Sequence, residues 1–172
     1  MKRRALLIGL AFLTGSIAAA QALAAPEVAE QILGTWKLIS YVGEDAATGA
    51  KADVMGEHAS GYINYGRDGR MIVIIVGAGR SKPAGSVATP AEAQALITSM
   101  LAYAGTYTLD TAAHTVTHHI EVSWDQTRTG ESHVRTYRLD GDRLTLITQP
   151  SRDPASGRTT VRTLTWERVR AP

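Results

Sequence analysis

The chain has 172 residues, no cysteine and a formal net charge of +2. A chain of this length forms one domain by the usual length prior. The lack of cysteine excludes disulfides, iron–sulfur clusters, cysteine-based zinc sites and thiol catalysis. No basic run follows the first four residues, so neither nucleic acid nor an anionic membrane is an expected partner.

The first 24 residues have the pattern of a secretory signal peptide. Positions 2–4 (KRR) precede an apolar run of about sixteen residues, and Ala22-Leu23-Ala24 forms an A-x-A cleavage site. The run is shorter than the roughly 20 residues that span a bilayer, so cleavage is expected rather than anchoring. Arg3-Arg4 loosely resembles a twin-arginine signal, but the very short basic region favours Sec-type export.

Cleavage after Ala24 would leave a domain of 148 residues, 25–172, in the periplasm or outside the cell. Its 15 Lys and Arg side chains and 16 Asp and Glu side chains give a net charge of −1. A chain of about 150 residues buries roughly 70% of its unfolded surface, which is enough for a real core. No integral membrane span is expected after cleavage, and the sequence does not indicate an oligomeric state.

Residue patterns in the mature chain predict strands joined by short turns. Residues 44–60 are expected to form a long loop, and Arg67-Asp68-Gly69 and Asp140-Gly141 are hairpin signals. The predicted strands are 36–41, 61–65, 71–76, 105–110, 115–124, 131–139, 143–148 and 159–169.

One convincing helix is predicted over residues 90–104. Thr89 can cap it, Pro90 suits its first position, and Glu92 completes a capping box. Sequential strands without βαβ alternation favour a mainly β fold. We therefore expect an eight-stranded antiparallel up-and-down barrel with one helix between strands 3 and 4.

Alternation along the strands predicts which side chains face the barrel interior. In 131–139 the favoured inner set includes Arg135 and Tyr137, with His133 near the rim, and Tyr107 faces inward on the preceding short strand. In 115–124 the inner set is Val116, His118, Ile120, Val122 and Trp124, which leaves His119 outside.

An inward arginine needs a carboxylate, water or an anionic ligand, because burying an isolated charge is costly. Arg135, with His118, Tyr107 and Tyr137 nearby, is therefore a candidate site for the polar head of a mostly apolar molecule. Two alternatives stay open. Arg135 could bond backbone carbonyls or an acidic residue such as Glu121, and His118 could be a satisfied core histidine.

Four of the five histidines lie within twenty residues, at positions 114, 118, 119 and 133. Neighbouring residues on a strand point to opposite faces, so His118 and His119 cannot share one ion. His118 and His133 could meet across a hairpin, but no third ligand is evident. We expect neither a metal nor a cofactor.

Serine nucleophile chemistry has no support, because no G-x-S-x-G elbow occurs. Any catalysis would be cofactor-free acid–base chemistry. His118 would be the general base, since its ordinary pKa lies near neutrality. Arg135 or a tyrosine hydroxyl would stabilise a developing oxyanion.

Several stretches resemble the bacterial and fungal family of lipocalin-like domain proteins. They are GTWKLISY, GYINYGRDGRM, AYAGTYTLD, TVTHHIEVS, VRTYRLDGDRLTL and LTWERV, in the expected order between Gly34 and Val169. Gly34-Thr35-Trp36 also resembles the G-x-W signature of the lipocalin superfamily. The resemblance implies an eight-stranded barrel closed at one end, with a cavity open at the other.

The resemblance also implies a structural role for Trp36, which would plug the closed end beneath Arg168. A cation over an indole face contributes roughly 0.5–2 kcal/mol. The chain departs from many relatives after Ser123, where Trp124-Asp125-Gln126 stands in place of a proline. This loop would lie near a barrel mouth, so no relative's ligand preference is carried over.

Three functions are compatible with these patterns. The favoured one is an exported carrier of a small amphipathic ligand, with acidic molecules among the candidates. The second is a cofactor-independent isomerase, cyclase or lyase that uses His118 and Arg135 on a small hydrophobic substrate. The third is an interaction module with a filled barrel. The predicted ligand-binding residues are Tyr107, His118, Trp124, His133, Arg135 and Tyr137.

Overall fold

The structure, a computed structural model, describes residues 25–153 and 157–170. The predicted signal peptide lies outside these residues. The elements, in chain order, are α1 (Ala25–Ile32), β1 (Gly34–Asp45), β2 (Lys51–Asp53), β3 (Ser60–Tyr65), β4 (Arg70–Val76), α2 (Pro90–Thr98), β5 (Met100–Asp110), β6 (Thr115–Ser123), the 3-10 helix η1 (Gln126–Arg128), β7 (Ser132–Asp140), β8 (Arg143–Thr148), β9 (Ser151–Arg152) and β10 (Thr159–Arg168).

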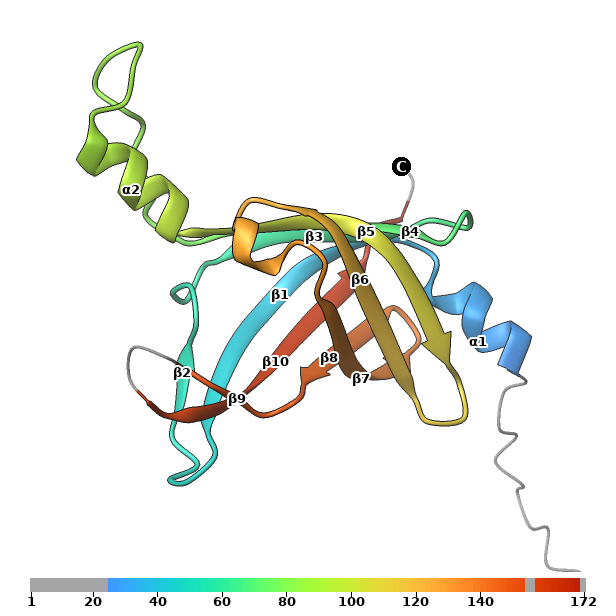
Figure 1. The fold of residues 1–172 in the computed structure, drawn as a ribbon. Helices are drawn as coiled ribbons and strands as arrows, with labels where there is room; N and C mark the ends of the chain where they lie inside the picture. The colour runs from blue at the N-terminus through green and yellow to red at the C-terminus, as the bar shows by residue number, and fades with distance from the viewer. Residues whose placement is uncertain (1–24, 154–156, 171–172) are drawn as a thin grey trace, which may run out of the picture.

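Eight strands form a closed antiparallel barrel, which confirms that expectation. The strand order is β1-β3-β4-β5-β6-β7-β8-β10, and pairing of β10 with β1 closes the ring. Two short strands are additional: β2 pairs with β1, and β9 pairs with β10. Figure 1 shows both beside the end of the barrel that lies away from α1. Since closure pairs every strand on both sides, the barrel itself has no free edge.

The predicted placement of the helix was wrong in two respects. The helix α2 follows β4, because β2 forms within the segment expected to be a loop. It also ends at Thr98 rather than at residue 104. The capping box that starts it is present, since Thr89 Oγ1 accepts from the backbone N–H of Glu92 and Glu92 accepts from that of Thr89.

Residues 100–104 form the first part of β5, because each of them pairs with a residue of β4. Met100 pairs with Val76, and Ala104 pairs with Ile72. Tyr103 is thereby turned into the barrel, where it is 5% exposed. Tertiary pairing overrides the helical propensity of this alanine-rich stretch.

A bulge in β6 corrects the expected inner face. Val116, His118 and Ile120 are buried as predicted, but Val122 is 61% exposed. The register passes from Ile120 to Val122 and leaves out Glu121, so the alternation reverses there. Gly105 lies opposite, where an added Cβ would be 1.9 Å from the His119 carbonyl oxygen. The bulge therefore requires glycine at this position.

The helix α1, the start of β1 and the end of β10 together seal the closed end of the barrel. Trp36 is fully buried, and the guanidinium carbon of Arg168 lies 4.1 Å from the centroid of its ring. This is the arrangement that the resemblance implied. Above this seal lies one apolar cluster that includes Ile63, Leu144 and Trp166, all at most 1% exposed.

The opposite end is the mouth of the barrel. It is bordered by β2, β9, η1 and the connection that carries α2 (Figure 1). The helix α2 projects from the barrel and has no buried residue. Among the described residues, no helix is long and apolar enough to cross a membrane.

Candidate functional site

A histidine held between two tyrosines lies inside the barrel. His118 is completely buried. Its Nε2 is 2.7 Å from the Tyr65 hydroxyl, and its Nδ1 is 2.9 Å from the Tyr103 hydroxyl. A neutral imidazole has one donor and one acceptor nitrogen, so one tyrosine donates to His118 and the other accepts from it. We call Tyr65, Tyr103, His118 and Arg135 the polar cluster.

Burial governs the protonation of the polar cluster. Desolvation, followed by the nearby Arg135 charge, lowers the pKa of His118 well below its ordinary value. Burial raises the pKa of Tyr65 well above its usual range. It also raises the pKa of Tyr103, although Arg135 partly opposes this. Near pH 7, the histidine and both phenols are therefore uncharged.

Arg135 is the charged member of the polar cluster. It is 9% exposed, and its Nη1 donates to the backbone carbonyl of His133 at 3.2 Å. Its guanidinium carbon lies 6.0 Å from the centroid of the Tyr103 ring. Within the described residues, no carboxylate forms an ion pair with Arg135, and Glu121 instead pairs with Arg70 on the outer wall. Of the alternatives for Arg135, the structure shows the carbonyl contact and not the Glu121 contact.

His133 lies at the edge of the polar cluster. It is the cross-strand partner of His118, and its ring centroid is 6.3 Å from that of Tyr103. Its Nε2 lies 2.7 Å from a carboxylate oxygen of Glu131. Burial lowers the pKa of His133, and the Glu131 contact opposes that shift.

A second arginine shares the inner face with Arg135. Thr148 is the register partner of Arg135, and its hydroxyl accepts a hydrogen bond from the backbone N–H of Arg162. The two arginines are thus two strands apart, roughly 10 Å along the sheet. Burial raises the pKa of the Tyr41 hydroxyl, and the charges of Arg162 and Arg135 both oppose that rise. Both arginines therefore act electrostatically on one inward phenol.

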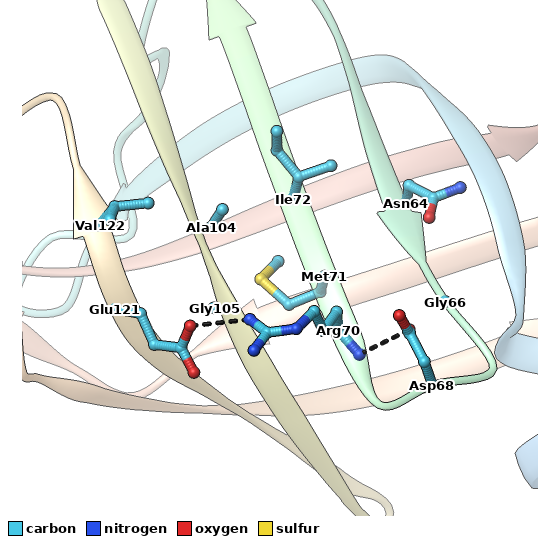
Figure 2. Close-up of a pocket in the computed structure, with 10 residues that line it drawn as sticks. All are labelled: Asn64, Gly66, Asp68, Arg70, Met71, Ile72, Ala104, Gly105, Glu121 and Val122. Carbon is cyan, nitrogen blue, oxygen red and sulfur yellow. Dashed lines mark hydrogen bonds and ion pairs between the residues drawn. The ribbon is translucent and has the colours of Figure 1, made fainter.

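Two hollows in the described part of the structure differ in where they lie relative to the polar cluster. One, of about 390 Å3, lies on the outer wall. Figure 2 shows Asn64, Ile72, Ala104 and Val122 across its floor and the Arg70–Glu121 ion pair, 2.8 Å long, at its side. The other, of about 440 Å3, lies at the mouth and includes Arg162.

Comparison with known families gives a clear result. The model of the lipocalin-like domain family matches residues 33–169, which is most of the chain. The chain belongs to this family. No curated protein matches the chain. A lipocalin-like barrel suggests that the protein binds a small hydrophobic ligand. The bacterial or fungal origin that the resemblance implied remains a prediction.

The lipocalin-like barrel places the predicted site residues in different regions. His118 and Arg135 lie together, with His133 beside them. Tyr107 is inward but next to Tyr65, with ring centroids 4.9 Å apart, and its hydroxyl donates to the Gly66 carbonyl. It is therefore part of the support of the polar cluster.

Tyr137 and Trp124 are not brought to the polar cluster by any contact in the described structure. Tyr137 is buried, and its ring packs against that of His114 at a centroid distance of 5.9 Å. Trp124 follows β6 directly and is half-buried. Among the described residues, the Trp124 Nε1 and the Tyr137 hydroxyl are buried without a hydrogen-bond partner. Their role in binding remains a prediction.

The two tyrosines that hold His118 were missed from the sequence. Tyr103 was assigned to the helix, which concealed its strand parity. Tyr65 was placed on a strand, and its alternation with the apolar Ile63 could have identified it as inward. Arg162 was also missed, although Leu164 and Trp166 continue the same alternation.

Two of the histidines predicted as possible metal ligands lie close together in this lipocalin-like barrel. His118 and His133 do meet across the β6–β7 pair. No group of three or more His, Asp or Glu side chains within residues 25–153 and 157–170 is arranged to hold an ion. Both nitrogens of His118 are moreover already engaged by tyrosines.

Proposed function

We propose that the protein is a carrier that binds a small amphipathic acid, with the acid group held by Arg135 inside the barrel. The observation that carries this proposal is the buried Arg135, which has no carboxylate partner among the described residues. Arginine stays protonated in proteins, so the site retains a positive charge. An anionic ligand would supply the missing counter-charge.

The chemistry around Arg135 supports an acid more than a neutral polar group. A guanidinium can donate two parallel hydrogen bonds to a carboxylate. The neighbouring His118 and Tyr103 are uncharged, so they add no competing anion. Hydrogen bonds to charged groups contribute about 1.5–3 kcal/mol, which corresponds to about 10- to 150-fold in affinity.

A second candidate function, cofactor-independent proton transfer, rests on the Tyr65–His118–Tyr103 chain. These hydrogen bonds could pass a proton between the two hydroxyls through the imidazole. The same geometry argues against His118 acting directly on a substrate, because it is fully buried and both nitrogens are occupied. We therefore favour binding over catalysis.

Calorimetric titration with decanoate and with decanol tests the proposal. The two probes share an apolar chain, but only decanoate carries a charge near pH 7. Decanoate should bind the wild-type protein at least about tenfold more tightly than decanol does. Arg135→Gln should remove that preference. The matched control is Arg138→Gln, because Arg138 is exposed on the same strand.

Equal binding of decanoate and decanol to the wild-type protein would contradict the role of Arg135. A loss of preference in Arg138→Gln would contradict it as well, because a general effect of charge would then suffice. Replacement of His118 by Gln distinguishes the second candidate, since a carrier should still bind decanoate. An enzyme would lose turnover by about 100-fold or more while still binding.

Export is part of the proposal. It is supported by the basic start, the apolar run and the A-x-A site in the first 24 residues. The test is mass spectrometry of the protein from the periplasm or culture medium of cells that express the full chain. A mature N-terminus at Ala25 is the expected result, and an intact protein retained in the cytoplasm would overturn it.

A further inference from the structure

The hollow at the mouth lies on the inner face of β1 and β10, at the ends of these strands that are farthest from α1. Tyr41 faces the interior, and Gly43 follows two residues later on the same face of β1. Gly43 is opposite Ala52 of β2 and opposite Arg162 of β10. We call this hollow, lined by residues of β1, of the segment 50–54 and of β10 and by Asp153 and Arg158, the mouth shelf.

Small residues make the mouth shelf hollow. Its lining includes Gly43, Ala50, Ala52 and Val54, and its volume is about 440 Å3. This lies within the range of small-molecule pockets, roughly 300–1,000 Å3. A Cβ at Gly43 would already come within 3.2 Å of a methyl carbon of Val54. These residues give the shelf one apolar side, whereas the rest of its lining is polar or charged: Asp45, Asp153, Arg158, Thr160 and Arg162. The apolar side is the part of the shelf that suits hydrocarbon.

The mouth shelf and the polar cluster lie on the same inner face of the barrel wall, because Arg135 and Arg162 are both aligned with Thr148 of β8. Arg162 lines the shelf, and its Nη1 donates to the Ser151 hydroxyl at 2.8 Å, which directs the guanidinium toward the rim. Tyr41 is buried on this face two residues before Gly43, and the charges of Arg162 and Arg135 both oppose the rise in its pKa that burial causes. A ligand that reaches from Arg135 to the shelf therefore passes Tyr41.

The other direction from Arg135 leads into the apolar core. Trp36, Ile63, Leu144 and Trp166 are at most 1% exposed there and belong to one cluster. Moving that packed core to admit a ligand would be costly, since extra atoms in a well-packed interior force side chains and backbone out of place. A ligand whose acid group reaches Arg135 therefore has its apolar part on the mouth side.

We propose that the ligand binds head-first, with its acid group at Arg135 and its apolar body on the mouth shelf. This rests on the proposed function and adds a second subsite and a ligand class. The ligand is a carboxylic acid whose apolar body is long enough to pass Tyr41 and lie against Ala52. Short acids occupy the polar cluster alone and gain nothing from the shelf.

Substitution on the two faces of β2 tests the mouth shelf. Ala52→Phe adds a ring on the inner face and fills the shelf. Asp53→Phe adds the same ring on the opposite face and is the matched control, since Asp53 is exposed and outside the hollow. The ligands are decanoate and butanoate, titrated by calorimetry and by NMR chemical shifts, respectively.

Ala52→Phe should weaken decanoate binding by about tenfold or more and leave butanoate binding unchanged. Asp53→Phe should change neither. Unchanged decanoate binding in Ala52→Phe would overturn the proposal that the shelf holds the apolar body. An equal loss of affinity for decanoate and butanoate would overturn it as well, because it would indicate a distorted polar cluster. Circular dichroism checks the fold, and Ala50→Phe provides a second variant on the same face. A wild-type protein that binds neither acid would instead contradict the proposed function.

Discussion

The guanidinium of Arg168 covers the indole of Trp36, and the two residues together cap α1. The Trp36 Nε1 donates to the Ile32 carbonyl at 2.9 Å. Arg168 donates to the Leu33 carbonyl at 2.8 Å and also to the Gln31 carbonyl. These carbonyls end α1, where helices leave their acceptors unpaired. The pair therefore fixes the helix and seals the barrel through the same contacts.

Replacing Arg168 by Met should destabilise the protein by about 1–3 kcal/mol. The variant loses the cation–π contact and leaves carbonyls at the end of α1 without donors. Urea denaturation measures the free energy of unfolding. Arg138→Met is the control on an exposed outer position and should stay within about 0.5 kcal/mol of wild type. Equal losses in both variants would refute a special role for Arg168.

His118 makes stability depend on pH. Burial lowers the pKa of folded His118 well below 6.5, whereas the unfolded chain has the ordinary value. Between these two pKa values the unfolded state binds more protons. The His118 contribution is therefore complete above about pH 6.5 and is lost as pH falls through the folded pKa.

Denaturation at pH 7.5 and at pH 5 measures this contribution. The free energy of unfolding should fall between these values in wild type, and the fall should be smaller in His118→Gln. His119→Gln is the matched control, because His119 is adjacent on β6 but lies on the outer face with Thr108 and Ser132. In His119→Gln the free energy of unfolding should fall between pH 7.5 and pH 5 by as much as in wild type. NMR titration of the His118 ring should show no protonation near pH 6.5.

Replacing Tyr103 by Phe should destabilise the protein by about 1–3 kcal/mol, because the Nδ1 of His118 then stays buried without a partner. A double-mutant cycle with His118→Phe measures the coupling by thermal unfolding. The double variant should lose less stability than the two single variants predict when added. Additive losses would show that the two side chains are not coupled.

Gly105→Ala should cost about 1–3 kcal/mol or more, since its methyl group would overlap the His119 carbonyl oxygen and the Glu121 amide. For a domain of this size, each kcal/mol lowers Tm by roughly 2–4 °C. Gly85→Ala is the control, because the nearest atom there is 3.6 Å away. A Tm for Gly105→Ala equal to that of the control would contradict the close approach at the β6 bulge.

Breaking α2 should leave the barrel intact. Ala95→Pro removes a hydrogen bond from the middle of this helix, but no residue of α2 is buried. Hydrogen exchange should accelerate in residues 90–99, while Tm changes by less than about 2 °C. A fall of Tm comparable to that of Gly105→Ala would show that α2 supports the barrel.

Much of the barrel could be predicted because its signals are local. Alternation in Val116, His118 and Ile120 correctly gave the inner face, and the Arg67-Asp68-Gly69 turn joins two paired strands. The Thr89 capping box correctly gave the start of α2. Each of these features depends on residues within a few positions of one another.

The errors arose where distant residues decide the structure. The end of α2 depends on β4, which pairs with residues 100–106. The outward turn of Val122 depends on a bulge that fits only against Gly105. The Tyr65–His118 contact joins residues 53 positions apart. No pattern within a single strand carries this information.

The pairing of β10 with β1 affects how the chain folds and whether a shortened chain stays in solution. Arg168 and Leu33, 135 positions apart, must meet before the ring is complete. Such non-local pairing is slow, and it needs β10, which follows the other barrel strands in the sequence. A chain that stops before β10 would be an open sheet with unpaired edges on β1 and β8. Unpaired strand edges promote aggregation, so C-terminal truncation should produce insoluble protein rather than a weakened binder.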